Sequence, residues 1–398
     1  MNMKWESIFL VIILLIMAGC GNNKQSGNLI TVDVTANYPK KELILQDIFE
    51  VEYVPLETND EFITSGGILA VGKEIMAFLN MGRFGGDGNL YLFDRKGKGI
   101  RVINRSGQSG EEYANIHEVI LDEVNNEFYI NSLFTSMVLV YDLSGNFKRS
   151  FKQRENFFYN RMGDFDRDYL ICHDGHLEFY KEDVKRNFFM VVSKQDGQIE
   201  EISIPYEKII VPMTFNREAN GRLNDRSIYN RELIRFGDSW LLMETSSDTI
   251  YRYSQDHTLT PFIVRSPSVK KMDPEIFLYP GVLTGRYYFL QAVKKEYDYV
   301  SNSGFPTTNL VYDNEEGAIF EYTAYNGDFI TKKSMSLVWE YPMFLIINNE
   351  EIAFAKRLEA HELVEAYGKG ELKGELKEIA ATLDEESNPV IMLVKHKK

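Results

Sequence analysis

The stretch Leu90-Tyr91-Leu92-Phe93-Asp94 opens a segment of eighteen residues that ends at Gly107 and decides the fold. The segment contains an apolar strand, a polar turn, a second apolar strand and a turn closed by glycine. Residues 128–145 repeat this pattern without a gap, and residues 310–327 repeat it once more. Short alternating strands bounded by Gly, Asn, Asp and Ser are typical of β-hairpins. The segment therefore predicts a fold that is built from repeated hairpins.

Two looser copies end at Gly197 and at His257, so five hairpins are recognisable between residues 84 and 327. Small antiparallel sheets that recur at intervals of several tens of residues are typical of a β-propeller. A single four-stranded blade leaves apolar faces uncovered, and blades that pack around a common axis cover them. We therefore predict an all-β fold, a six-bladed β-propeller, with a β-sandwich or a solenoid as the alternatives.

The sixth blade has to be assembled from residues that flank the five hairpins. Candidates for its strands are residues 68–71 and 75–79. Ring closure in propellers joins strands from opposite ends of the chain, which removes exposed sheet edges. We therefore expect residues 29–34 to lie near or beside residues 390–394.

Helix is expected mainly between residues 355 and 383, with a break near residues 368–370. The second half of this region places its apolar side chains on one stripe, at helical spacing. These side chains are Leu372, Leu376, Ile379, Ala380 and Leu383. The pattern predicts a short C-terminal helical segment that packs on the rim of the propeller.

An apolar run from Ile8 to Ala18 lies close to the N-terminus, after Lys4 and before Gly19-Cys20. The run is shorter than the roughly 20 residues that a membrane-spanning helix needs, and it has the length of a signal-peptide core. Small residues directly before a cysteine favour a bacterial lipoprotein signal over an ordinary secretory signal. We therefore predict that residues 1–19 are a lipoprotein signal peptide and that lipid on Cys20 attaches the protein to a membrane.

Three expectations about organisation and location follow from this signal. Residues 20–28 are polar and rich in small residues, which predicts a flexible tether ahead of a propeller at residues 29–398. Gly21 stands where an aspartate would favour the inner membrane, so we expect the outer membrane of the cell envelope. No acidic run follows Cys20, which favours the periplasmic leaflet over the cell surface.

Composition excludes some partners and one kind of covalent support. Acidic residues outnumber basic ones by 59 to 44, and the formal net charge is −15. No nucleic acid partner is expected, because binding to phosphate backbones depends on clustered Lys and Arg. If Cys20 carries lipid, Cys172 is the only other cysteine, and no intramolecular disulfide forms. Cys172 lies in an apolar, strand-like run and is predicted to be a buried, inert thiol.

Several features together resemble a known group of proteins. They are the signal sequence, the segment Val51-Glu52-Tyr53-Val54-Pro55-Leu56-Glu57-Thr58, the degenerate hairpins, and the closing Glu385-Glu386-Ser387-Asn388-Pro389-Val390. In these features the chain resembles the six-bladed β-propeller lipoproteins of Bacteroidota, whose repeats are similar to NHL repeats. The resemblance covers essentially the whole mature chain. It implies a fold and an envelope location, and it supplies no catalytic motif.

Motifs for metal and phosphate binding are incomplete, so no metal and no cofactor are expected. The carboxylates of residues 164–168 alternate as in a calcium loop, but Tyr169 stands where an EF-hand needs glycine. His173 and His176 flank a turn, yet a zinc site needs at least a third protein ligand. The glycine-rich residues 82–88 lack the Gly-Lys-Ser/Thr ending of a phosphate-binding loop.

Candidate binding residues come from the loops that enter the presumed inner strands, because propeller ligands bind where loops converge at one mouth of the channel. Aromatic side chains with Arg and His could stack on and hydrogen-bond a sugar or a peptide. These candidates are Tyr113, His117, Tyr159, Arg161, Tyr279 and Arg286. Separately, Asp248-Thr249-Ile250 matches a short acceptor pattern for O-glycosylation, which makes Thr249 a possible attachment site; a strand-opening turn explains the same residues.

The preferred function is a non-enzymatic envelope lipoprotein that binds a protein, peptide or glycan partner through its propeller loops. No catalytic residue is assigned, since the sequence has no Gly-x-Ser-x-Gly elbow and no base that can be paired with Cys172. The alternative is a hydrolase or lyase that acts at the channel mouth, because propellers also host enzymes. A third hypothesis is a scaffold subunit of a larger outer-membrane complex. Clustered carboxylates with raised pKa values in a deep pocket would favour the enzyme.

Overall fold

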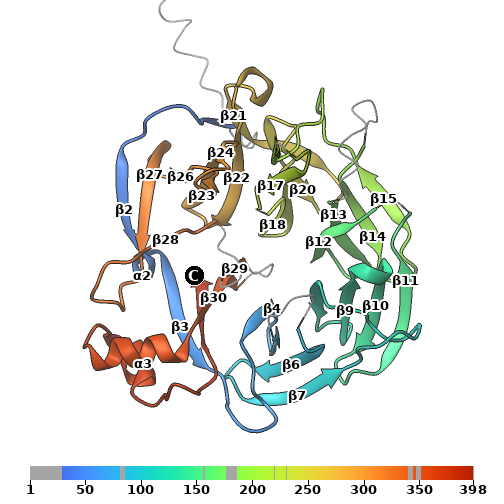
Figure 1. Ribbon diagram of the computed structural model, residues 1–398, viewed down its shortest axis with the longest axis vertical. Helices are drawn as coiled ribbons and strands as arrows, with labels where there is room; N and C mark the ends of the chain where they lie inside the picture. Colours follow the sequence, from blue (N-terminus) through green and yellow to red (C-terminus); the bar gives the residue numbers. More distant parts are fainter. Residues whose placement is uncertain are drawn as a thin grey trace, which may run out of the picture.

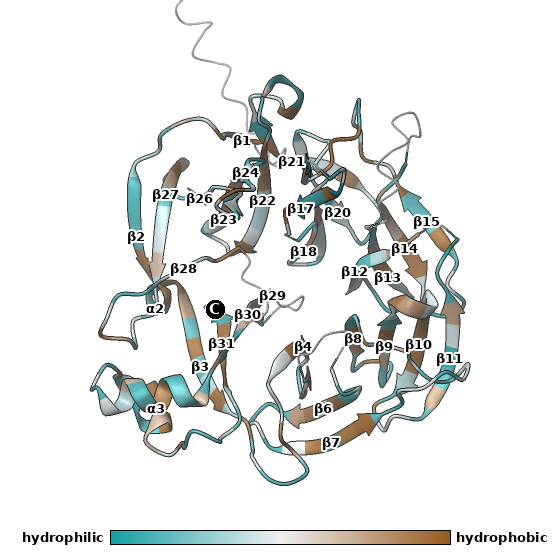
Figure 2. Ribbon diagram, in the orientation of Figure 1, coloured by the Kyte–Doolittle hydropathy of each residue, from teal (hydrophilic) through white to brown (hydrophobic). Residues whose placement is uncertain are grey.

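The computed structural model is a ring of six β-sheets around a central axis, which confirms the six-bladed propeller (Figure 1). It describes residues 29–80, 86–155, 157–175, 186–218, 220–229, 231–338, 344–346 and 351–397. Each blade has four antiparallel strands, and the strand nearest the axis comes first except where noted below. Figure 2 shows that apolar residues concentrate on the strands, while polar residues dominate the connecting loops.

Blades 1 to 3 follow one another along the chain. Blade 1 contains β4 (Gly67–Val71), β5 (Ile75–Leu79), β6 (Asn89–Asp94) and β7 (Gly99–Asn104). Blade 2 contains β8 (Glu118–Asp122), β9 (Glu127–Ser132), β10 (Met137–Asp142) and β11 (Phe147–Lys152), with η1 (Leu133–Thr135) in one loop. Blade 3 contains β12 (Tyr159–Asp164), β13 (Tyr169–Asp174), β14 (Phe189–Ser193) and β15 (Ile199–Ile202).

Blades 4 and 5 each gain a parallel outer strand from the N-terminal segment. Blade 4 contains β18 (Leu233–Phe236), β19 (Ser239–Leu242), β20 (Thr249–Ser254) and β21 (Leu259–Ser266), and β1 (Ile30–Asp33) pairs with β21. Blade 5 contains β22 (Ile276–Leu283), β23 (Tyr287–Lys294), β26 (Thr307–Asp313) and β27 (Ala318–Tyr325). Its outer edge is paired with β2 (Lys40–Ile44) and, over two residues, with β28 (Ser334–Met335). The short helix η2 (Val269–Lys271) connects the two blades.

Blade 6 closes the ring with strands from both ends of the chain. It contains β29 (Phe344–Ile346), β30 (Ile352–Leu358), β31 (Val390–His396) and β3 (Phe49–Pro55). The expectation that residues 29–34 lie beside residues 390–394 is wrong, because β1 pairs with blade 4 instead. The strand that pairs with β31 over seven residues is β3, which holds most of the Val51–Thr58 segment.

The proposed strands of the sixth blade also need correction. Residues 68–71 and 75–79 belong to β4 and β5, which complete blade 1 with the first hairpin. The repeated unit explains the error, because it is a hairpin rather than a blade. Its first copy is β6–β7, the third and fourth strands of a blade, whereas its second copy is β9–β10, the second and third strands. Any two neighbouring strands produce the same apolar–turn–apolar pattern.

The hydrophobic core lies between neighbouring blades rather than at one centre. Separate clusters of buried side chains join blades 1 and 2, blades 2 and 3, and blades 3 and 4. Another cluster joins blade 6 to blade 1, and the largest one holds blades 4, 5 and 6 together. Burial of apolar surface on both faces of every blade therefore makes the ring the unit of stability. Cys172 is fully buried in the cluster between blades 2 and 3, as predicted.

The C-terminal helical region forms two helices, α3 (Ala360–Gly368) and α4 (Gly374–Ala380). Leu372, Leu376 and Ala380 are buried in the largest core cluster, so the predicted stripe does pack on the outer part of blade 6. Residues 355–358 belong to β30 rather than to a helix. The helix α2 (Leu45–Ile48) connects β2 to β3. In the described part of the chain, no helix has the length and apolar character that crossing a bilayer requires.

A close contact between blades 3 and 4 yields a stability prediction. A Cβ atom at Gly163 in β12 would lie 2.1 Å from Cη2 of Trp240, whose side chain is fully buried. Gly163→Ala should therefore lower the free energy of unfolding by about 1–3 kcal/mol, the usual cost of overpacking a core. Denaturant unfolding measures this effect. Gly110→Ala is the matched control, because nothing lies within 4 Å of its Cβ position, and equal stability of the two variants would contradict the packing described here.

Candidate functional site

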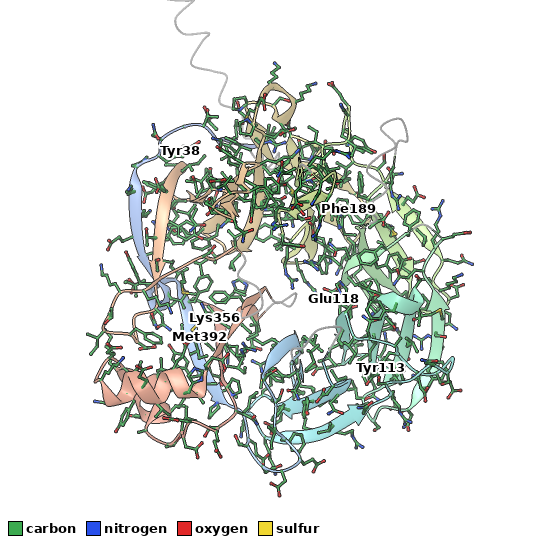
Figure 3. The ribbon with its side chains drawn as sticks, in the orientation of Figure 1. Tyr38, Tyr113, Glu118, Phe189, Lys356 and Met392 are labelled. Atoms are coloured by element: carbon green, nitrogen blue, oxygen red, sulfur yellow. The ribbon has the colours of Figure 1, made fainter. Side chains whose placement is uncertain are left out.

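The direction of the strands defines which residues meet at one mouth of the channel. In an antiparallel blade, the start of the first strand and the end of the second strand lie at the same edge. The inner strands β8, β12, β18 and β22 neighbour one another in that order around the axis. The residues that begin β8, β12 and β18, together with those that end β13 and β19, therefore surround one mouth. Figure 3 shows Glu118, at the start of β8, closer to the axis than Tyr113.

A pocket of about 330 Å³ opens at this mouth between blades 3 and 4. Its wall is formed by the edges of β12, β13 and β19 and by the connection from β15 to β18. This connection carries an additional hairpin, β16 (Met213–Arg217) and β17 (Leu223–Ser227). The lining is mostly apolar or aromatic, with a few charged and polar groups. Such a composition is typical of sites for small ligands.

Arg161 and His173 are direct cross-strand partners on one side of the pocket. A register shift between Tyr159 and Arg161 breaks the alternation of β12, and bulges of this kind redirect side chains. Tyr159 consequently packs in the core between blades 2 and 3, while Arg161 lines the pocket. The buried Nε of Arg161 and the buried Nδ1 of His173 have no hydrogen-bond partner. Burial lowers the pKa of His173, which favours the neutral imidazole.

Two carboxylates complete the polar part of the pocket. Glu232, just before β18, places Oε2 3.9 Å from Nδ1 of His173, and this oxygen also lacks a hydrogen-bond partner. Glu244, just after β19, is buried and accepts hydrogen bonds from Ser246 N at 3.0 Å and Thr245 Oγ1 at 3.3 Å. Burial raises the pKa of Glu244 to about 7, although both hydrogen bonds lower it.

A second polar group lies behind the pocket at the junction of blades 2 and 3. Glu118 accepts a hydrogen bond from Met162 N at 2.5 Å. Burial raises the pKa of Glu118, while the positive charges of Arg161 and Arg231 lower it. Burial also lowers the pKa of Arg231 to about 10, so this guanidinium stays charged at neutral pH. The mouth thus contains charges of both signs in a partly desolvated wall.

The structure brings together only some of the six predicted binding residues. Arg161 lines the pocket, and His117 lies nearby, with Nε2 3.3 Å from Asn160 O. Tyr279 is buried in β22, close enough to Glu232 and Glu244 for their charges to raise its pKa. Tyr113 is fully buried between blades 1 and 2, where its hydroxyl donates to Gly88 O.

Arg286 lies at the opposite face of the ring, in the turn between β22 and β23. Its guanidinium binds Asp313, which Lys41 also binds. A hollow of about 750 Å³ lies beside it. Among the described residues, those that line this larger hollow contribute no buried polar atom that lacks a partner. For this reason the smaller pocket is the better candidate site.

The remaining sequence predictions receive placements without a test. Thr249 begins β20 and is partly buried, and the neighbouring Asp248 accepts hydrogen bonds from Arg265 and Val269 N. Cys20, the signal peptide and the tether lie outside the described residues, as does His176. Asp164 forms an ion pair with Lys194, which also binds Asp122. The described residues contain no group of three or more His, Cys, Asp or Glu side chains arranged to hold a metal ion.

His173, Glu232 and Glu244 were missed because sequence reasoning considered only the loops that enter inner strands. A usable signal was present for two of them. His173 and Glu244 each end or directly follow a buried second strand, at Leu170-Ile171-Cys172 and at Leu241-Leu242-Met243. Polar residues at such positions face the same mouth as the residues that enter the inner strands. The additional hairpin β16–β17 had no comparable signal.

Comparison with known proteins identifies the family. A family model described as a domain of unknown function, DUF4934, matches residues 29–395. The chain belongs to the DUF4934 family. The comparison with curated proteins found no match.

Two solved structures show how widely the architecture is shared. A "putative exported protein" from Bacteroides fragilis is 16% identical, with a TM-score of 0.58, and the match covers 93% of this chain and 99% of that chain. A member of the DUF4221 family from Bacteroides vulgatus is 10% identical, with a TM-score of 0.48 and coverage of 88% and 98%. The first of these likenesses supports the propeller fold.

The raised pKa of Glu244 yields a prediction about stability and pH. Its folded-state pKa of about 7 exceeds the ordinary value of 4.5, so the folded protein binds more protons than the unfolded chain between these pH values. Stability should therefore fall as pH rises through this window. Glu244→Gln removes the ionisable group and retains an oxygen that accepts the same hydrogen bonds. It should match the parent near pH 4 and exceed its stability by up to about 3 kcal/mol at pH 8.

Denaturant unfolding at several pH values measures this difference. Glu74→Gln is the control, since Glu74 is exposed, and it should not alter the pH dependence. A constant difference between Glu244→Gln and the parent at all pH values would contradict a raised pKa.

Proposed function

We propose that the protein is an exported, lipid-anchored binding module whose ligand enters the pocket between blades 3 and 4. The observation that carries this proposal is a cavity of about 330 Å³ in which buried polar atoms of Arg161, His173 and Glu232 lack partners. An unsatisfied buried polar atom costs about 1–3 kcal/mol, so a ligand that binds these atoms gains affinity from them. The apolar lining supplies the remaining contact surface.

The export and anchoring parts of the proposal rest on the N-terminal sequence. The apolar run before Cys20 has the length and the ending of a lipoprotein signal. The Bacteroides fragilis protein with the same fold is named as exported, which agrees with that location. The proposed partners are the membrane, through lipid on Cys20, and a peptide or glycan of the envelope. The outer membrane, with the periplasmic leaflet as the preferred side, remains the proposed site.

Anchoring can be tested by changing the acylated residue. Cys20→Ala should abolish incorporation of labelled fatty acid and shift the protein from the membrane fraction to the soluble fraction. Cys172→Ala is the control, because Cys172 is buried in the core and should not affect fractionation. A Cys20→Ala protein that still fractionates with membranes would contradict lipid anchoring.

Ligand binding can be tested by filling the pocket. Ser227 lines the pocket, so Ser227→Trp should occupy much of it. A panel of short peptides and oligosaccharides is screened by thermal shift against the parent protein, Ser227→Trp and the control Gln108→Trp, which changes an exposed residue far along the chain. We expect ligands that stabilise the parent and Gln108→Trp but not Ser227→Trp. Ligands that stabilise all three proteins equally would contradict the pocket as the site.

A second candidate function is acid–base catalysis on the bound ligand. Glu244 favours it, because a carboxyl with a pKa of about 7 is suited to donate or accept a proton at neutral pH. Recovery of the ligand after incubation separates the two functions. Binding predicts the ligand unchanged, whereas hydrolysis or elimination predicts products that Glu244→Gln no longer forms.

A further inference from the structure

The three unpartnered atoms in the pocket form a pattern that selects one ligand chemistry. Arg161 Nε–H can only donate a hydrogen bond, and Glu232 Oε2 accepts one. His173 Nδ1 accepts in the neutral tautomer that carries its proton on Nε2, and the side chain is only 9% exposed. A matching ligand therefore presents a donor toward Glu232 and His173 and an acceptor toward Arg161.

The distances indicate how these two ligand groups are arranged. Glu232 Oε2 and His173 Nδ1 are 3.9 Å apart, so a single ligand nitrogen or oxygen can lie at hydrogen-bond distance from both. Arg161 is the cross-strand partner of His173, and such partners have Cβ atoms about 4.5–5.5 Å apart. The donor and the acceptor of the ligand must therefore be only a few bonds apart.

Charge favours an ammonium group as the donor. Among the charged residues that line the pocket, the carboxylates of Glu232, Glu244 and Asp174 outnumber the guanidinium of Arg161. Asp174 is neutralised by its ion pair with Arg186, which leaves Glu232 and the partly ionised Glu244 facing the cavity. A positively charged donor next to Glu232 gains a charge-assisted hydrogen bond, which is stronger than a bond from a neutral hydroxyl.

The other side of the pocket is suited to an apolar side chain. It is lined by Ile209, Ile210, Val211, Met213, Ile228 and Phe188. A glycan would leave this surface without hydrogen-bond partners for its hydroxyls. The first residue of a peptide has an ammonium group, a carbonyl oxygen three bonds away, and a side chain that can cover the apolar wall.

We propose that the pocket binds the free amino terminus of a peptide that begins with a large apolar residue. The ammonium group binds Glu232 and His173, the first carbonyl oxygen accepts from Arg161, and the first side chain packs on the apolar wall. This inference rests on the proposed function, because it assigns a ligand class to the same pocket.

Isothermal titration of the mature protein with four probes tests this inference. The probes are Leu-Gly-Gly, its N-acetylated form, Gly-Gly-Gly and maltotriose. Leu-Gly-Gly should bind most tightly, and acetylation should weaken binding by about tenfold or more, since a lost charge-assisted hydrogen bond is worth about 1.5–3 kcal/mol. Gly-Gly-Gly should bind about tenfold or more weakly, because it leaves the apolar wall uncovered.

Glu232→Gln provides the matching change in the protein. It should weaken Leu-Gly-Gly by about tenfold but leave the acetylated peptide unchanged, while Glu74→Gln affects neither. The acetylated probe tests the same contact without any mutation, so a poorly folded variant does not prevent a result. Equal binding of free and acetylated peptides would overturn the inference. Binding of maltotriose alone, blocked by Ser227→Trp, would overturn the inference and leave the proposed function intact. Failure of all four probes to bind would overturn the inference, and the wider panel then tests the proposed function separately.

Discussion

The pairing of β3 with β31 is the interaction on which the rest of the structure depends. Seven residues near the N-terminal end of the propeller pair with seven residues at its C-terminal end, and together they complete blade 6. Every blade then has a neighbour on both faces, so the clusters between blades bury apolar surface all around the ring. Without this pairing, blade 6 would lose its outer strand, and the chain would expose a sheet edge that invites aggregation.

Closure of the ring also explains why the mouth can hold buried charges. The inner strands are held in place by their blades, so the residues at their ends cannot move apart to reach water. Glu118 is held by a backbone N–H of the neighbouring blade, and Arg161 lies opposite His173 in the same sheet. Groups that lack partners in such a wall gain from a ligand that supplies them, because little further ordering of the protein is required.

The sequence predicts the architecture better than the site, for physical reasons. Alternating strands and turn residues are local signals, so the hairpins, the buried Cys172 and the C-terminal helices were predicted correctly. Which strand closes the ring is a nonlocal property, and β1 and β3 both look like edge strands in sequence; the choice between them was wrong. Arg161 was selected beside Tyr159 as if both shared a face, but the bulge in β12 separates them. His173, Glu232 and Glu244 meet only through the geometry of two blades.

A crystal structure of the mature protein with Leu-Gly-Gly tests the central claim most directly. The claim is that the mouth between blades 3 and 4 is a preformed binding site. The account predicts density for the peptide between Glu232 and Arg161, with its leucine on the apolar wall and little movement of β12, β13 and β18. Peptide density at another place on the ring, with the pocket occupied only by solvent, would contradict the account.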